Sequence, residues 1–365
     1  MPPLARRLDF NPNLIGLAVL CVVLLPAPLI LDRFQAGIAV QVLLFALLGV
    51  AWNLMSGFAG EFSFGHAAFF GLGAYAAAFL VASGRVSPWV GMLVGAILAA
   101  VLGIAIGYLS FRYRLRGVYF ALATFALAEM LRLLVSGLDA LNGPRGITIP
   151  LVGGGSSWAM VQFATGAPEY FYVALALFAL TQLAVILLIR SRWGLLILAT
   201  REDAEGAAAA GVDTLRYRLL AISASAALTA VGGAYYAVYY FFVNPDTAFG
   251  SAVSIAILLP AVVGGMGSLW GPVLGSVLVT LLGQAAVGAT RAPPEALAFL
   301  RGVAGLDRII YGVALIVMIM FLPRGLVPGL ATLATLRRRR RSRSGSRSGR
   351  KPGEAGPAEG GYASP

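Results

Sequence analysis

The chain contains very few of the side chains that carry out covalent chemistry. It has one histidine, His66, and one cysteine, Cys21, which excludes a metal site built from several histidines and a disulfide within the chain. Its one lysine is Lys351, and the sequence contains no phosphate-binding loop of the form G-x-x-x-x-G-K-S/T. We therefore expect no catalytic residue, no metal and no cofactor in this chain.

Glu129 and Arg132 are the charged side chains with the most suggestive spacing. They are three residues apart in an apolar stretch, which places both on one face of a helix, where they can form an ion pair. Charged groups inside apolar segments are costly and tend to serve function. The pair could line a path for a solute or lock two helices together. Alternatively, Arg132 reaches the edge of the apolar layer and Glu129 is only its partner.

Several other residues could contact a solute, although no spacing singles them out. His66 could carry a proton, or it could be a packing residue whose ring is hydrogen-bonded. The remaining candidates are polar or glycine positions, namely Asn53, Ser63, Thr124, Gln182, Gly264 and Gly265. Glycines that interrupt a helix expose backbone groups that can bind a small molecule, but glycines also form tight turns and allow close helix packing.

The elements that must position these residues are membrane-spanning helices. Hydrophobic residues make up 59% of the 365-residue chain, the mean hydropathy is +0.86, and 12% of residues are charged, against ~25% in a soluble domain. Soluble, disordered and nucleic-acid-binding classes are therefore excluded for the body of the chain. A spanning helix needs about 20 apolar residues, so the sequence predicts an all-α polytopic transmembrane helical bundle of about ten spans.

The candidate spans are apolar runs bounded by glycine, proline or charged residues. They are 14–31, 35–55, 62–83, 89–110, 117–135, 170–189, 219–242, 252–264, 271–288 and 308–323. The eighth and ninth are the weakest, and they could form a broken or re-entrant pair around the glycine-rich segment between them.

The positive charges indicate which side of the membrane each loop occupies. With the N-terminus in the cytoplasm, twenty of the Lys and Arg residues fall on the cytoplasmic side and six on the external side, as the positive-inside rule requires. Both termini are therefore expected to be cytoplasmic. The predicted organisation is an N-terminal segment 1–13, a transmembrane domain 14–323 with an external loop 136–169 and a cytoplasmic loop 190–218, and a tail 324–365. The arginine-rich tail should be disordered and could lie on anionic membrane lipid, whereas nucleic acid is not expected as its partner.

The cytoplasmic loop is predicted to contain a short helix that a partner could bind. Thr200 is a suitable N-cap, Asp203 suits the first turn, and Gly211 is a natural terminator after a run of alanines. This predicts a helix of about ten residues with small side chains that permit close approach by another protein. The alternative is an interfacial helix that only joins two spans. The candidate coupling residues are Arg201, Glu202, Asp203, Glu205, Gly206, Ala207 and Gly211.

The spacing of Glu205 and Gly211 around an alanine run resembles the E-A-A-x-x-x-G loop of ABC importer permeases. Gly206 stands where that motif has its first alanine, and residues 221–224 read Ala-Ile-Ser-Ala in place of the trailing Ile-x-Leu-Pro. The absence of the trailing Ile-x-Leu-Pro favours the branched-chain amino-acid branch of the family over sugar or oligopeptide importers. Further stretches resemble the same branch, and they are 53–60, 62–75, 117–132, 142–150 and 263–275. The resemblance runs from about Val50 to Arg324 and is closer to the M-type permease subunit than to the H-type.

The resemblance implies an import complex in the bacterial inner membrane. This chain would pair with a homologous second permease subunit, two cytoplasmic ABC ATPases and a periplasmic substrate-binding protein. ATP hydrolysis would then occur on separate chains, and the cytoplasmic helix would sit in a groove of an ATPase.

Two alternatives stay open from the sequence. The same architecture could import urea or short amides, because nearly every residue in the spans suits an apolar solute and the cargo cannot be identified from them. A stand-alone secondary transporter could instead use Glu129, Arg132 and His66 to relay protons.

Overall fold

A computed structural model of the chain describes residues 12–84, 86–113, 115, 117–151, 156–164, 166–291, 305–321 and 325–327. The chain divides into two compact units, Met1–Val327 and Pro328–Pro365. The predicted tail lies outside the described residues except for 325–327, and so does the predicted N-terminal segment except for residues 12 and 13. The helical bundle belongs to the first unit.

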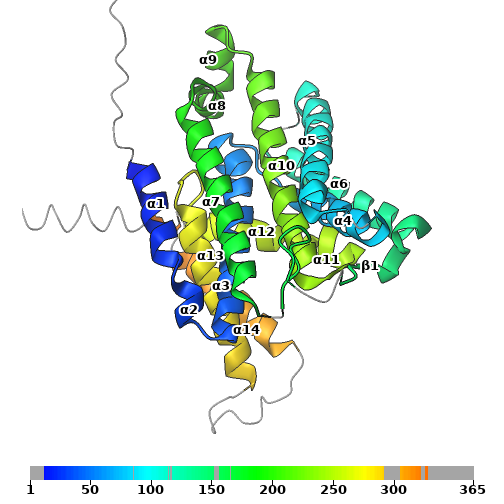
Figure 1. Cartoon of the computed structure of the whole chain (residues 1–365). Helices are drawn as coiled ribbons and strands as arrows, with labels where there is room; N and C mark the ends of the chain where they lie inside the picture. The colour runs from blue at the N-terminus through cyan, green and yellow to red at the C-terminus, as the bar shows by residue number, and fades with distance from the viewer. Residues whose placement is uncertain are drawn as a thin grey trace, which may run out of the picture. The chain divides into compact units, whose positions relative to one another are not determined.

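The described part of the chain is almost entirely helical, as predicted (Figure 1). Its long helices are α1 (Pro12–Leu24), α3 (Arg33–Asn53), α4 (His66–Gly84), α5 (Pro88–Arg112), α6 (Val118–Ser136), α7 (Pro168–Arg190), α10 (Thr214–Tyr240), α12 (Ser251–Gly264), α13 (Gly271–Arg291) and α14 (Leu306–Phe321). Short helices α2 (Ala27–Ile30) and α11 (Pro245–Phe249) extend α1 and precede α12.

Nine helical segments within the described residues are long and apolar enough to cross a membrane. Each overlaps one of the first nine predicted spans. The tenth predicted span, 308–323, overlaps α14, and residues 322 and 323 lie outside the described residues.

Small residues let the helices approach closely, which is the packing role expected for most glycines in a membrane bundle. On α4, Gly73 lies so close to the Ala230 carbonyl of α10 that a Cβ atom would collide with it. On α13, Gly275 lies equally close to the Pro260 carbonyl of α12. A larger side chain at either position would force these helix pairs apart.

The predicted external loop is tied to the end of α10 by a short sheet. Strand β1 (Ile147–Thr148) pairs antiparallel with β2 (Phe242–Val243), with Ile147 opposite Val243. Two 3-10 turns, η2 (Asp139–Leu141) and η3 (Gly143–Arg145), precede β1. The loop is therefore fixed to the same end of the bundle as the last turn of α10.

The predicted cytoplasmic loop contains two helices, so the prediction of one helix capped by Thr200 is wrong. Helix α8 (Arg192–Glu202) begins earlier, because the Ser191 side chain caps it, and Thr200 lies inside it with its hydroxyl donating to the Leu196 carbonyl. Helix α9 (Ala204–Ala209) follows after the extended residue Asp203. The propensity of residues 192–199 to continue a helix outweighed the capping preference of Thr200.

Asp203 is the true cap of α9. Its Oδ1 accepts hydrogen bonds from the backbone amides of Glu205 and Gly206, both at 3.0 Å. Gly211 ends this segment as predicted, with φ of +85°. Figure 1 shows α8 and α9 together at one end of the bundle, next to the beginning of α10.

Candidate functional site

The helix that begins as α3 is interrupted at the glycine-rich segment that contains Gly57, Gly60 and Gly65. Helix α3 passes into a π-helical turn, η1 (Leu54–Phe58), and the backbone is then irregular until α4 begins at His66. Gly60 has φ of +78°, a conformation that favours glycine. The predicted third span therefore starts four residues later than expected, and π-helical turns of this kind often mark functional positions.

Asn53 joins this break to the glycine-rich turn between α12 and α13. Its Nδ2 donates to the Ser268 carbonyl at 2.9 Å, and its Oδ1 accepts from the Gly267 amide at 2.8 Å. Both polar atoms of the Asn53 amide group thus bind the same turn, which lies 214 to 215 positions later in the sequence. Asn53 acts as a clamp between α3 and the α12–α13 turn.

The α12–α13 connection is a tight turn. Helix α12 ends at Gly264, whose Cα lies against the Gly271 backbone where α13 begins. Gly265 and Gly267 both have positive φ, at +117° and +75°. Gly264 and Gly265 therefore lie in a tight turn between the two helices.

Ser63 and His66 belong to a buried hydrogen-bond network at the start of α4. The ring Nδ1 of His66 lies 3.2 Å from Ser63 Oγ, and its Nε2 lies 2.9 Å from Ser225 Oγ on α10. Ser225 donates its own proton to the Ala51 carbonyl at 2.6 Å, so its oxygen is free to accept from Nε2. This pattern fits a neutral imidazole with the proton on Nε2, and it supports the packing role of His66.

Thr124 lies where α6 crosses the same break. Its hydroxyl donates to the Ala121 carbonyl one turn earlier at 2.9 Å, and the side chain is buried. The backbone carbonyl of Thr124 lies directly against Gly65, where any side chain would collide with it. Thr124 therefore holds α6 against the start of α4.

The predicted ion pair between Glu129 and Arg132 is confirmed, and it includes a third residue. Arg132 Nη2 lies 2.6 Å from Glu129 Oε1, and Arg132 Nη1 lies 2.7 Å from Oδ1 of Asp246 on α11. Asp246 was missed in the sequence, although the Asn-Pro-Asp-Thr cap of α11 is a signal for a helix start there. The cluster ties α6 to α11, which supports the lock between helices.

A second ion pair, also missed in the sequence, ties the break to α10. Arg218 Nε lies 3.2 Å from Oε1 of Glu61, and the two side chains are 13% and 7% exposed. The Arg218 guanidinium also lies 5.6 Å from the ring centre of Phe111 on α5. Glu61 follows a glycine in an otherwise apolar stretch, so its charge was the only sequence signal for this pair.

Arg201 connects α8 to both glycine-rich segments. An added Cβ at Gly60 would lie 2.9 Å from Arg201 Cγ, and one at Gly267 would lie 3.0 Å from Arg201 Nη1. The side chain of Arg201 therefore lies between the break after α3 and the α12–α13 turn. Beyond it, Glu202, Glu205 and Gly206 are exposed, whereas Ala207 faces the bundle. The outer face of α9 is thus available to a partner.

Comparisons with known proteins agree with one another on the kind of protein this is. A family profile described as "Branched-chain amino acid transport system / permease component" matches residues 35–322. The high-affinity branched-chain amino acid transport system permease protein LivM of Salmonella typhimurium is 27% identical over 332 residues, which cover 86% of this chain and 74% of that protein. LivM of Escherichia coli K12 is 26% identical with the same coverage.

A second permease protein is also similar. The high-affinity branched-chain amino acid transport system permease protein LivH of Salmonella typhimurium is 25% identical over 251 residues, which cover 64% of this chain and 79% of LivH. No solved structure is a significant match to the chain. The region that matches the family profile contains both glycine-rich segments and helices α8 and α9.

Proposed function

Because the chain belongs to the family of branched-chain amino acid transport system permease components, we propose that it forms a translocation path in an ATP-driven importer of these amino acids. The observation that carries the proposal is the family match over residues 35–322. The chain is a multi-pass membrane protein and a transport component. Its likeness covers more of the chain for LivM than for LivH, which agrees with the M-type resemblance of its motifs.

The proposed docking site for a separate ATPase is the surface of α8 and α9. The residues assigned to it are Arg201, Glu202, Asp203, Glu205, Gly206, Ala207 and Gly211. Support comes from the exposed, small side chains of α9 and from the firm caps at both its ends. This assignment places α8, α9 and both termini in the cytoplasm of a bacterium, with the chain in its inner membrane.

Arg201 offers a route from the docking site into the bundle. A push on α8 reaches the Arg201 side chain, which lies against Gly60 and Gly267. Asn53 holds those two segments together, so α3, α12 and α13 would move as one group. Arg218 and Glu61 carry the same displacement to α10. ATP-driven closure of the ATPases would thereby change the arrangement of four helices.

The complete importer would also contain a homologous second permease subunit, a second ATPase and a periplasmic substrate-binding protein. The candidate path residues act in this account mainly by holding helices in place. Asn53, His66 and Arg132 each make at least two side-chain contacts to other segments or charged groups. The proton relay of a stand-alone carrier gains no support from residues held in this way.

Uptake assays test the proposed function directly. Cells that make the complete importer should take up labelled leucine, and deletion of this chain should abolish that uptake. Urea tested in parallel distinguishes the two cargoes. Leucine uptake that persists without the chain would contradict the proposal. Uptake by proteoliposomes holding this chain alone with a proton gradient would establish a carrier instead.

A further inference from the structure

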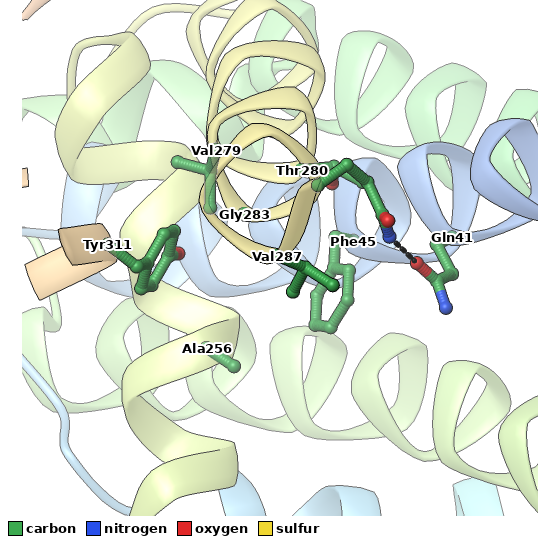
Figure 2. Close-up of a pocket in the computed structure, with 9 residues that line it drawn as sticks. Gln41, Phe45, Ala256, Val279, Thr280, Gly283, Val287 and Tyr311 are labelled. Carbon is green, nitrogen blue, oxygen red and sulfur yellow. Dashed lines mark hydrogen bonds between the residues drawn. The ribbon is translucent and has the colours of Figure 1, made fainter. Parts of the chain in front are cut away.

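A cavity of about 280 Å³ lies between α3, α12, α13 and α14, and none of the residues discussed above lines it. Gln41 and Phe45 of α3 line one side, and Gly283 of α13 and Tyr311 of α14 line the other. Ala256 of α12 closes a third side, and Figure 2 shows these residues around the cavity. Its volume is close to the lower end of the roughly 300–1,000 Å³ range of small-molecule sites.

Two glutamine amides meet at the edge of this cavity. Gln284 Nε2 lies 3.5 Å from Gln41 Oε1, and Gln41 Nε2 donates to the Tyr240 hydroxyl at 3.1 Å. A separation of 3.5 Å is long for a hydrogen bond, so a ligand can take over these groups at little cost. An amide offers both a donor and an acceptor, which suits the carboxylate and the ammonium group of a free amino acid. Thr280 adds a hydroxyl to the lining.

The rest of the lining is apolar. Phe45, Val279 and Val287 supply hydrocarbon surface, and the ring of Tyr311 adds to it. No charged side chain is among the described residues that line the cavity. A solute with one polar end and one branched apolar end matches this division. Urea has no apolar part, so it would make no hydrophobic contact with most of this lining.

The cavity lies toward the end of the bundle away from α8 and α9. Gln41 contacts Tyr240, the last residue of α10, and α10 begins just after α9 and is about 40 Å long at 1.5 Å per residue. A second hollow of about 310 Å³ shares Phe45 and Ala256 with the cavity and reaches Asp246 of α11. The two hollows together run from the Arg132–Asp246 cluster to the glutamine pair.

We propose that the cavity between α3, α12, α13 and α14 is a transit site for the amino acid itself, with the Gln41–Gln284 pair on its polar end and Phe45, Val279 and Val287 around its side chain. This assignment rests on the proposed function. The absence of a full charge among the described lining residues keeps binding weak, which a transit site needs so that the solute can leave again.

Three walls of this site, α3, α12 and α13, are the helices that Asn53 and Arg201 link to the proposed docking site. Helix α3 carries Gln41 in the site and Asn53 in the clamp, about 18 Å apart along the helix. Helices α12 and α13 line the site with Ala256 and Gly283 and meet at the turn that contacts Arg201. A displacement of α3, α12 and α13 as one group would therefore move three walls of the site relative to the fourth, α14, and change the width of the site.

A matched pair of glycine substitutions on α13 tests the site in the complete importer. An added Cβ at Gly283 points at the Tyr311 ring from 3.7 Å, so Gly283→Leu fills the cavity without a backbone collision. An added Cβ at Gly288 meets nothing within 4 Å, so Gly288→Leu adds the same bulk outside the cavity. We expect Gly283→Leu to lower leucine uptake at least about tenfold, and Gly288→Leu to change it by less than about twofold.

A labelling experiment gives an answer that does not depend on transport. Cys21 is the only cysteine of the chain, so Cys21→Ala provides a background without thiols. A cysteine introduced by Ala256→Cys in that background should react with a small charged thiol reagent, and millimolar leucine should slow the reaction whereas urea should not. A cysteine introduced by Gly288→Cys should react at a rate that leucine leaves unchanged.

The outcomes separate this inference from the proposed function. Normal leucine uptake by Gly283→Leu would overturn the site, and so would labelling at Ala256→Cys that leucine leaves unchanged. The labelling result decides the matter if Gly283→Leu fails to assemble. An unmodified importer that takes up no leucine would instead overturn the proposed function, and the assignment of the site would fall with it.

Discussion

Substituting Gly60 by alanine isolates the contact through which α8 touches the broken helix. Gly60 has φ of +78°, and an added Cβ would lie 2.9 Å from Arg201 Cγ. Two costs therefore arise, a backbone strain of about 1–2 kcal/mol and an overpacking cost of about 1–3 kcal/mol. Both destabilise the native arrangement at the point where the proposed push enters the bundle.

A control for the backbone strain exists in the same chain. Gly117 has φ of +57°, and an added Cβ there meets nothing within 4 Å. Gly117 also has ψ of −124°, outside the left-handed α region, so Gly117→Ala should show a backbone strain of about 1–3 kcal/mol alone. Truncation by Arg201→Ala removes Cγ, so in that background Gly60→Ala should cost no more than Gly117→Ala.

The assay combines two readouts on the purified complete importer. Thermal unfolding should show Gly60→Ala as the less stable single variant, and the number of leucine molecules imported per ATP hydrolysed should fall for Gly60→Ala while Gly117→Ala keeps the wild-type ratio. Gly60→Ala and Gly117→Ala could instead have equal effects on stability and on coupling, both with and without Arg201→Ala. That result would refute the Gly60–Arg201 contact as the route by which a displacement of α8 enters the bundle.

Three further predictions follow from other parts of the bundle. Glu205→Lys or Gly211→Trp should leave membrane insertion intact, measured by membrane-fraction yield, but should uncouple ATP hydrolysis from uptake; fully coupled import would argue against docking at α9. Thr280→Val removes one hydroxyl at nearly constant volume and should raise the KM for leucine roughly threefold to tenfold, whereas an unchanged KM would exclude contact with the solute. Asp246→Asn weakens its ion pair with Arg132, and because the Asp246 side chain is 78% exposed, the melting temperature should fall only slightly; a large fall would show that the cluster is buried in the assembled importer.

Hydrophobic patterning was sufficient to predict most of the fold. Within the described residues, nine of the ten predicted spans correspond to helices that are long and apolar enough to cross a membrane. The pattern is reliable because a segment in lipid must satisfy its backbone hydrogen bonds internally, as a helix does. The prediction was weakest where helices end. The start of α4 was predicted at residue 62 instead of His66, since the π-helical turn and the irregular backbone after it contain the same apolar residues as a helix.

The site was only partly predictable, because its contacts join residues far apart in the sequence. The Glu129–Arg132 pair was found because both partners lie on one helix turn, whereas Asp246 completes it from another helix. Asn53 was selected as a polar residue in a span, but its partners on the α12–α13 turn could not be identified without the fold. The helix start predicted at Thr200 was wrong because a threonine hydroxyl can cap the start of a helix or donate to a carbonyl within its own helix. In this chain it donates to the Leu196 carbonyl of α8.

The most direct test of the account is a crosslink between α9 and an ATPase subunit in the assembled importer. Ala208 lies on the exposed face of α9, and Ala208→Cys in the Cys21→Ala background offers one reactive position there. A thiol crosslinker should join this position to the ATPase, and a membrane-impermeant thiol reagent added to intact cells should leave it unlabelled. Labelling of that position from outside the cell, with no crosslink to any ATPase, would contradict the account.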